Sequence, residues 1–427
     1  MKQPFELTAS EAAQAISRGD LTSEELTQSC LDRIAERDGN VKAWVFVDRD
    51  MALAQARHCD ETPAKGPLHG VPVGIKDMLD TADMPTEYNS PIYPGFRPAR
   101  DAACVSILRS QGAVILGKVS TVEFASLGQK PPTGNPHNTS HTPGGSSSGS
   151  GAAVGDNMVP VALGTQTGGS VIRPASFCGA AGMKPSYGLI STEGIKVYAQ
   201  SLDTIGYMGR SAEDLGRVSM AFGVIDGLPE PIEPGALKIG LFKTQHWEEA
   251  ETATRDAIAL AAERLANAGA RVVEVSVPPE FEQLTEMQDR IMHWEGRGAY
   301  RPEYLAAQER LAQAFRDEVE NAKQRTIPQI IEAYDQLALA RTVFERKFAG
   351  FDAWLTPAVP GEAPKGLEST GLATFNRMWT ALHCPCITLP CSKGENGLPV
   401  GIQLVSPRLT DARLLAVAAA TEIAMSV

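Results

Sequence analysis

The spacing of apolar residues predicts a chain that begins in helices and then alternates between strands and helices. In residues 6–60, Thr8 and Thr22 each precede a glutamate by three positions, a helix-capping pattern, and apolar residues then recur at helical spacing. From residue 66 onward, short apolar runs bounded by glycine and proline predict strands, and the longer stretches between them predict helices. This alternation is typical of an α/β protein.

Individual elements follow from the same patterns. Strands are expected in the apolar runs that end at Lys76 and Lys118, and at 158–163, 237–242, 271–277, 352–355, 386–390 and 400–405. Helices are expected at 102–111, 211–227, 251–268, over most of 280–350, and from Asp411 onward. Aromatic residues in 280–350 either line a leaving-group pocket or pack in the core.

We therefore predict one α/β domain, a mixed sheet covered by helices on both faces. Within 1–427, its expected parts are an N-terminal helical cover (6–60), a catalytic core (66–227), a helical insertion that is a candidate lid (280–350), and a C-terminal part of the core (351–427).

Composition narrows the classes of function. A hydrophobic content of 43% is that of an ordinary globular enzyme. The formal charge of −12, with no basic run, argues against a nucleic-acid-binding surface, so we expect no nucleic acid partner. The N-terminus lacks a signal-like apolar core and the chain lacks an uncharged run long enough to span a bilayer, so we expect no membrane partner.

Cysteine usage points to a reducing cytoplasm and away from metal chemistry. The seven cysteines are scattered and form no C-x-x-C pair, so neither a zinc site nor a redox dithiol is expected. Cys384 and Cys386, with His383 beside them, are the only cluster, and we interpret them as buried apolar residues. We expect no metal and no organic cofactor.

The strongest chemical signal lies between Gly144 and Pro174. Two glycine-rich loops, each with serine, bracket one apolar run there, and glycine is useful where the backbone comes close to a ligand. Ser170 follows Thr167-Gly168-Gly169, so a hydroxyl nucleophile lies beside backbone amides that few side chains obstruct. The amides of Thr167, Gly168, Gly169 and Ser170 are therefore the predicted oxyanion hole of an acyl-transfer site.

Ser170 needs a base to take its proton. Because residues 144–174 contain no histidine, we interpret a lysine as that base. Lys76 and Lys118 each close an apolar strand, and burial lowers the pKa of a lysine enough to make it a base. Periodicity alone does not decide between them. A carboxylate next to the base would raise its pKa, so we expect Asp77 to point away from Ser146.

The same stretch has rival interpretations. The run from Gly145 to Gly149 matches G-x-S-x-G, the nucleophile elbow of α/β-hydrolases, with Ser147 at its centre. That elbow needs a preceding strand, whereas residues of loop composition precede it here. It also needs an acid and then a histidine later in the chain, and Asp203 or Asp352 followed by His383 would have to fill these roles. A dinucleotide turn has the wrong spacing. A plain linker does not explain the second glycine pair behind the strand.

The strand with Lys76, the GGSSSGS loop and the GTQTGGSVIRPASFCGAAGMKPSYG segment resemble the amidase signature family, whose members hydrolyse amides and related C–N bonds with a Ser-cisSer-Lys triad. In that family the nucleophile follows the cis serine by 24 positions, as Ser170 follows Ser146. The resemblance implies Ser170 as nucleophile, Ser146 as proton relay and Lys76 as base. It extends through TPAVPGEAP and GLPVGIQLVSP, and two runs near the triad are most similar to bacterial malonamidase-type enzymes.

The substrate stays open at this stage. Arg173 either pairs with a substrate carboxylate, as the malonamidase similarity implies, or anchors the loop. Thr165 and Gln166 are the other candidate substrate-binding residues, whereas Asp203 is expected to be structural. The first function considered is an amidase on small amides. The alternatives are a carbamate (urethane), urea or aryl-amide hydrolase with the same triad, and a subunit of a tRNA-dependent amidotransferase. Whether the chain forms a homodimer is left open.

Overall fold

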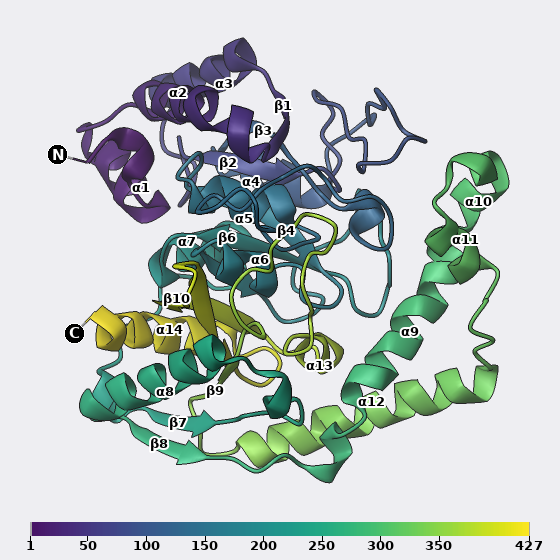
Figure 1. Ribbon diagram of the computed structural model, residues 1–427. Coiled ribbons are helices and arrows are strands. Elements are labelled where there is room, and N and C mark those ends of the chain that lie inside the picture. The colour runs from purple at the N-terminus through teal and green to yellow at the C-terminus, as the bar shows by residue number, and fades with distance from the viewer. Residues whose placement is uncertain (1, 427) are drawn as a thin grey trace.

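One mixed sheet runs through the computed structural model, which describes residues 2–426 (Figure 1). Its 11 strands are β1 (Trp44–Val47), β2 (Pro72–Lys76), β3 (Val114–Val119), β4 (Val161–Gln166), β5 (Ala181–Lys184), β6 (Thr204–Gly209), β7 (Lys238–Leu241), β8 (Arg271–Glu274), β9 (Ala353–Pro357), β10 (Cys386–Lys393) and β11 (Pro399–Val405). Their order across the sheet is β1-β3-β2-β4-β6-β5-β10-β11-β9-β7-β8. The pairs β2/β3, β2/β4, β7/β8 and β7/β9 are parallel, and the others are antiparallel.

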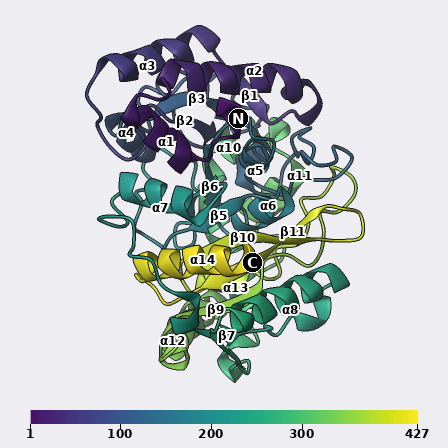
Figure 2. The ribbon, with the colours of Figure 1, turned by 90° about the vertical axis from the view of Figure 1, so that its left-hand side faces the viewer.

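Helices flank this sheet, which confirms the predicted fold class. They are α1 (Ala9–Arg18), α2 (Ser23–Val41), α3 (Arg49–Glu61), α4 (Ala103–Ser110), α5 (Ser148–Gly155), α6 (Ile172–Phe177), α7 (Ala212–Ala221), α8 (Thr252–Asn267), α9 (Leu284–Ala299), α10 (Arg301–Ala307), α11 (Gln313–Val319), α12 (Ile327–Phe348), α13 (Arg377–Ala381) and α14 (Asp411–Ser426). Figure 2 shows α8 and α14 in front of the sheet and α10 and α11 behind it. Over residues 2–426, no helix has both the length and the apolar character needed to cross a bilayer.

Two large apolar clusters form the interior. The first lies between the sheet and the helices α7, α8 and α14, and contains aliphatic side chains of nearly every strand. The second lies under the helices α9 to α12 and is rich in aromatic residues. In it the Tyr300 ring lies 4.6 Å from Phe315 and 5.3 Å from Tyr198, centroid to centroid. Tyr300 and Phe344, from the segment 280–350, are buried and therefore belong to the core. Burial of such aromatic rings is a main source of stability.

The structure differs from the predicted elements at three strands. Residues 6–60 contain the two capping boxes at Thr8 and Thr22, but also β1, which pairs with β3 at the sheet edge. β5 and β6 lie where the sequence predicts no strand. Both are buried along their whole length and contain glycine, so they lack the alternation that marks a strand with one wet face.

The order of β3, β2 and β4 places the chemistry-bearing residues together. β2 lies between β3 and β4 and is parallel to both, so the carboxyl ends of these strands meet at one edge of the sheet. Lys76 ends β2, and Thr165 and Gln166 end β4. Residues at the carboxyl ends of neighbouring parallel strands are where α/β proteins build their sites.

Candidate active site

Lys76 is held between two hydroxyl groups at this edge. Its Nζ lies 2.8 Å from Ser146 Oγ and 2.7 Å from Thr165 Oγ1, and its side chain is completely buried. Burial lowers the pKa of Lys76 to about 7, and the negative charge of Asp203 opposes this shift. A large share of Lys76 is therefore neutral near pH 7, so its amine can accept a proton from Ser146.

The loop that carries Ser146 is fixed by its own backbone. The Gly145–Ser146 peptide bond is cis, at the position that the resemblance implies. The Ser146 carbonyl accepts hydrogen bonds from the amides of Val122 and Ser148, at 3.1 and 2.9 Å. Helix α5 begins at Ser148, immediately after this turn. These contacts hold the Ser146 hydroxyl beside Lys76.

Ser147, the centre of the rival elbow motif, is placed differently. It is fully buried, and its Oγ lies 3.3 Å from both the carbonyl oxygen and the amide nitrogen of Thr165. His383, the histidine that an elbow triad would use, stacks on Tyr187 and bonds the Ser201 carbonyl at 2.8 Å. Neither residue is arranged as a nucleophile and its base, so the geometry favours the lysine-based site.

The second loop presents Ser170 among unoccupied amides. Within residues 2–426, the N–H groups of Thr167, Gly168, Gly169 and Ser170 donate no hydrogen bond to a protein acceptor. Ser170 is 9% exposed, and Gly168 is the most open residue of the loop. Unpaired backbone donors are rare in a protein interior. Such amides are suited to bind the oxygen of a substrate carbonyl, and their role as an oxyanion hole stays a prediction.

Side chains from distant parts of the chain hold this loop. Gln166 Oε1 accepts from the amides of Val171 and Ile172, and Gln166 Nε2 donates to Thr380 Oγ1 at 3.0 Å. Gln288 Nε2 donates to the Thr167 carbonyl at 2.9 Å. Gln166 is fully buried. Both ends of its amide are used within the protein, so the geometry gives it a positioning role rather than the predicted contact with substrate.

Asp203 is a site residue that the sequence does not reveal. Its carboxylate accepts from Thr167 Oγ1 at 2.5 Å and from the Tyr198 amide at 2.6 Å. Burial raises the pKa of Asp203 to about 6, and these hydrogen bonds and the charge of Lys76 oppose the shift. No motif marks Asp203, because its contact with Thr167 and its charge effect on Lys76 arise from the pairing of β4 with β6.

Arg173 ties three segments together. Its Nη1 donates to the Gly371 carbonyl at 2.7 Å and its Nη2 to the Gly145 carbonyl at 2.5 Å, while its own amide bonds the Gly169 carbonyl. The side chain is 7% exposed. Both terminal nitrogens of the guanidinium are thus engaged by backbone, which favours the anchoring alternative over direct binding of a substrate carboxylate.

Lys118, the rival base, is paired instead. Its Nζ lies 3.0 Å from Asp77 Oδ1 and donates to Thr86 Oγ1 at 2.6 Å. Asp77 in turn accepts from the Glu87 amide. Asp77 therefore points toward Lys118 and away from Ser146, as expected. Burial lowers the pKa of Lys118, and the charge of Asp77 opposes this shift. Lys118 thus has a carboxylate partner where Lys76 has a serine hydroxyl, which favours Lys76 as the base.

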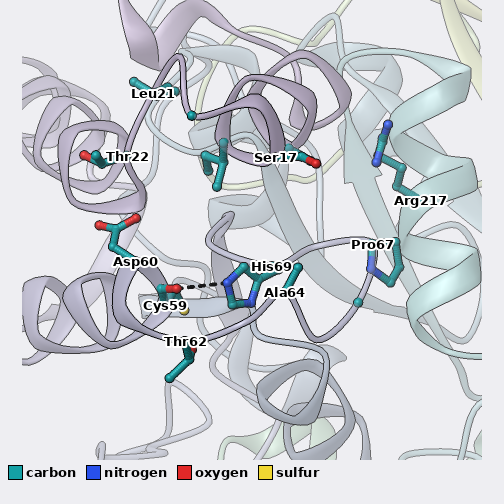
Figure 3. Close-up of a pocket in the computed structure, with 14 residues that line it drawn as sticks. Ser17, Leu21, Thr22, Cys59, Asp60, Thr62, Ala64, Pro67, His69 and Arg217 are labelled. Carbon is teal, nitrogen blue, oxygen red and sulfur yellow. Dashed lines mark hydrogen bonds between the residues drawn. The ribbon is translucent and has the colours of Figure 1, made fainter.

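A separate hollow lies near the N-terminus. It has a volume of about 470 Å³ and is lined by α1, the turn before α2, the end of α3, residues 62–69 and Arg217 of α7 (Figure 3). Its polar groups are already paired: Asp60 accepts from the Ser23 and Glu24 amides, and His69 Nε2 bonds the Cys59 carbonyl at 3.0 Å. None of the triad residues lines it.

The cysteine cluster shows no metal-ligating arrangement. Cys384 and Cys386 are buried, and each thiol contacts a backbone carbonyl. Among residues 2–426, no three His, Cys, Asp or Glu side chains gather as a metal site would require.

The chain is similar to known proteins along nearly its whole length. A family model described as Amidase matches residues 25–415. A glutamyl-tRNA(Gln) amidotransferase subunit from Lysinibacillus sphaericus is 32% identical over 472 residues, which covers 98% of this chain and 96% of that protein. Further curated relatives carry the same name. A specific similarity to malonamidase-type enzymes stays a prediction.

Solved structures of amidases superpose on nearly the whole chain. A structure described as an amidase has a TM-score of 0.88 at 27% identity, covering 98% of this chain and 100% of that chain. The native peptide amidase from Stenotrophomonas maltophilia has a TM-score of 0.81 at 28% identity, covering 99% of this chain and 97% of that chain.

The names of the curated relatives contradict one prediction, that nucleic acid is no partner. These relatives are subunits of an amidotransferase whose name includes glutamyl-tRNA(Gln). The prediction rests on the net charge of −12, and that inference is wrong because net charge describes one chain alone. An acidic subunit is compatible with an assembly in which another subunit provides the basic surface.

Proposed function

Since this chain belongs to the Amidase family, we propose that it cleaves C–N bonds of amides through an acyl-enzyme on Ser170. The observation that carries the proposal is the contact of buried Lys76 with Ser146, 2.8 Å from Nζ to Oγ, with a pKa of about 7 at Lys76. A neutral amine next to a serine hydroxyl is what a lysine-based proton relay requires.

The reaction runs in two steps. In the first, Ser170 Oγ attacks the amide carbonyl while its proton moves to Ser146 Oγ and the Ser146 proton moves to Lys76 Nζ. The free amides from Thr167 to Ser170 bind the oxyanion. The relay then returns the proton to the leaving nitrogen, and the C–N bond breaks. In the second step water attacks the ester of Ser170 by the same relay, which releases the acid and regenerates the hydroxyl.

A second candidate function is that of the amide-cleaving component of a tRNA-dependent amidotransferase. The names of the curated relatives, at about 32% identity over the full chain, support this alternative better than they support a free-standing amidase. In this case the same triad releases ammonia from a carboxamide donor, and the ammonia is used in an assembly with partner proteins. Carbamate, urea and aryl-amide hydrolysis use the same triad and remain further alternatives.

The triad is tested by labelling. Phenylmethylsulfonyl fluoride is added to wild type, Ser170→Ala and Ser147→Ala, followed by intact-mass analysis and peptide mapping. We expect a single adduct on Ser170 in wild type and Ser147→Ala, and none in Ser170→Ala. An adduct on Ser147, or amide hydrolysis that persists in Ser170→Ala, contradicts the proposal.

The two candidate functions differ in what the isolated chain does. Release of ammonia or of the corresponding amine is measured for the purified chain with glutamine, asparagine, alkyl amides, anilides and aryl carbamates. A free-standing amidase turns over at least one of them alone. A component of an amidotransferase is nearly inactive alone, and the chain tagged at its own chromosomal locus then copurifies with partner proteins and tRNA. Turnover by the isolated chain, together with purification free of both, excludes the second candidate.

A further inference from the structure

A partly exposed arginine lies against the middle of the Ser170 loop. Arg377 is the first residue of α13, and a methyl group placed on Gly168 would lie 3.6 Å from Arg377 Cγ. Its side chain is 30% exposed, unlike Arg173, which is buried. Gly168 is two residues before Ser170, a span of at most about 7 Å. Arg377 is therefore within reach of a small molecule bound at Ser170.

The carboxylate of Asp289 pairs with three basic side chains next to the Ser170 loop. Asp289 of α9 lies 3.0 Å from Arg377 Nη1, 3.0 Å from Arg325 Nη2 and 3.2 Å from His293 Nε2. His293 has a second carboxylate, Glu318, at 2.6 Å from its Nδ1. After these pairings, one arginine of the Arg377–Arg325 pair has no carboxylate of its own within residues 2–426.

Arg173, three residues after Ser170, adds a charge that no carboxylate within residues 2–426 pairs with. It pairs with backbone carbonyls only, and its buried Nε has no acceptor within the described residues. Burial lowers the pKa of Arg173 to about 9, with a further contribution from the nearby charge of Arg377, yet Arg173 remains charged at neutral pH. Three cations, Lys76, Arg173 and Arg377, thus lie around the Ser170 loop with two carboxylates, Asp203 and Asp289. The loop carries a small positive excess in a chain with a net charge of −12.

We propose that Arg377 binds a carboxylate of the substrate, so that the preferred amides are short and carry a carboxylate a few bonds from the scissile carbonyl. This inference rests on the proposed function at Ser170. Arg377 supplies donors at the open side of the loop, because a guanidinium binds a carboxylate with two parallel hydrogen bonds. The charge of Arg173 strengthens the field at the same place, while its anchored geometry keeps it from contacting the ligand.

The test measures protection of Ser170 without requiring turnover. Phenylmethylsulfonyl fluoride modifies Ser170, and the rate is followed by intact mass with increasing succinamate or succinamide. These two probes differ only in whether one end is a carboxylate or a carboxamide. We expect succinamate to protect at an about tenfold lower concentration, the scale of one charge-assisted hydrogen bond. Added salt is expected to reduce this difference.

Three variants locate the effect. Arg377→Met is expected to abolish the difference between the probes, and Arg377→Lys, which keeps the charge, to retain part of it. Arg408→Met is the matched control, because Arg408 is also partly exposed and also pairs with a carboxylate, Glu345. Glu345 lies near the C-terminal end of α12, whereas Arg325 lies just before its N-terminal end. This control is expected to keep the full difference.

The outcomes separate the two proposals. If Ser170 is labelled but both probes protect equally, or if the difference survives in Arg377→Met, the carboxylate site is refuted and the triad stands. If no label reaches Ser170 in wild type, the proposed function fails and this inference fails with it. A loss of the difference in Arg408→Met also overturns the inference, because a remote charge would then have the same effect.

Discussion

Lys76 is the residue whose titration controls the proposed chemistry. Only its neutral form accepts the proton of Ser146, and burial lowers its pKa to about 7. We therefore expect kcat/KM to rise with pH and to level off above an apparent pKa near 7. A pH–rate profile between pH 5.5 and 9 on any turned-over amide measures this.

A variant at Asp203 tests whether Lys76 controls that pH–rate profile. Its negative charge raises the pKa of Lys76, so Asp203→Asn is expected to move the rising limb to lower pH. A rising limb that stays in place, or moves to higher pH, would show that another group controls the rate.

Arg173 is expected to act through structure. Arg173→Met leaves the carbonyls of Gly145 and Gly371 without their donor, at a cost of about 1–3 kcal/mol each when buried. We expect a loss of about 2–6 kcal/mol in the free energy of unfolding and lower activity on charged and uncharged amides alike. Urea unfolding and kinetics on both classes measure this. If stability is unchanged and only carboxylate-bearing amides lose activity, Arg173 binds substrate directly.

At the scale of elements, α9 connects the insertion to the Ser170 loop through ionisable groups. His293 lies between Asp289 and Glu318, and although burial opposes the shift, these carboxylates raise its pKa above the usual value. The same contacts, with Arg377, hold the pKa of Asp289 below its usual range, again against burial. The contact of α9 with Glu318 of α11 is therefore strongest when His293 is charged.

This coupling predicts a pH-dependent stability. A group whose pKa is raised on folding contributes its full stabilisation below its unfolded value near 6.5, and that contribution is lost as pH rises through the folded value. The stability difference between wild type and His293→Gln is thus expected to be largest near pH 6, at about 1–3 kcal/mol, and to shrink by pH 9. Urea unfolding at both pH values measures it. A difference that grows with pH contradicts the assigned charge.

The elements differ in how far the sequence predicts them. Strands with β-branched or aliphatic runs, such as β2, β3, β4 and β11, follow from local pattern. β5 and β6 do not, because four to six fully buried residues with glycine have no alternation. Among site residues, the glycine-serine loops are visible in local motifs, whereas Lys76 is one of two lysines that end an apolar strand and only the family resemblance selects it. Asp203, Asp289 and Arg377 are not visible in local motifs, because their contacts span 36 to 88 residues.

At the scale of the whole molecule, strands from the N-terminal and C-terminal halves of the chain pair within one sheet. β5 pairs with β10, and β7 with β9, so strands from before and after the insertion share one ladder. We expect a single unfolding transition. Far-ultraviolet circular dichroism and tryptophan fluorescence should give coincident curves, since Trp44 and Trp354 lie near opposite edges. Two separated transitions would show that the halves unfold independently.

The pairing of β5 with β10 also sets a delay during synthesis on the ribosome. Lys184 meets Cys386 in that ladder, so about 200 further residues must be made before the edge of β5 is covered, or about 10–40 s at usual elongation rates. During that time the nascent chain presents an open strand edge of the kind that pairs with other chains. Yield in the cell is therefore expected to depend on chaperones that bind the unfinished N-terminal half.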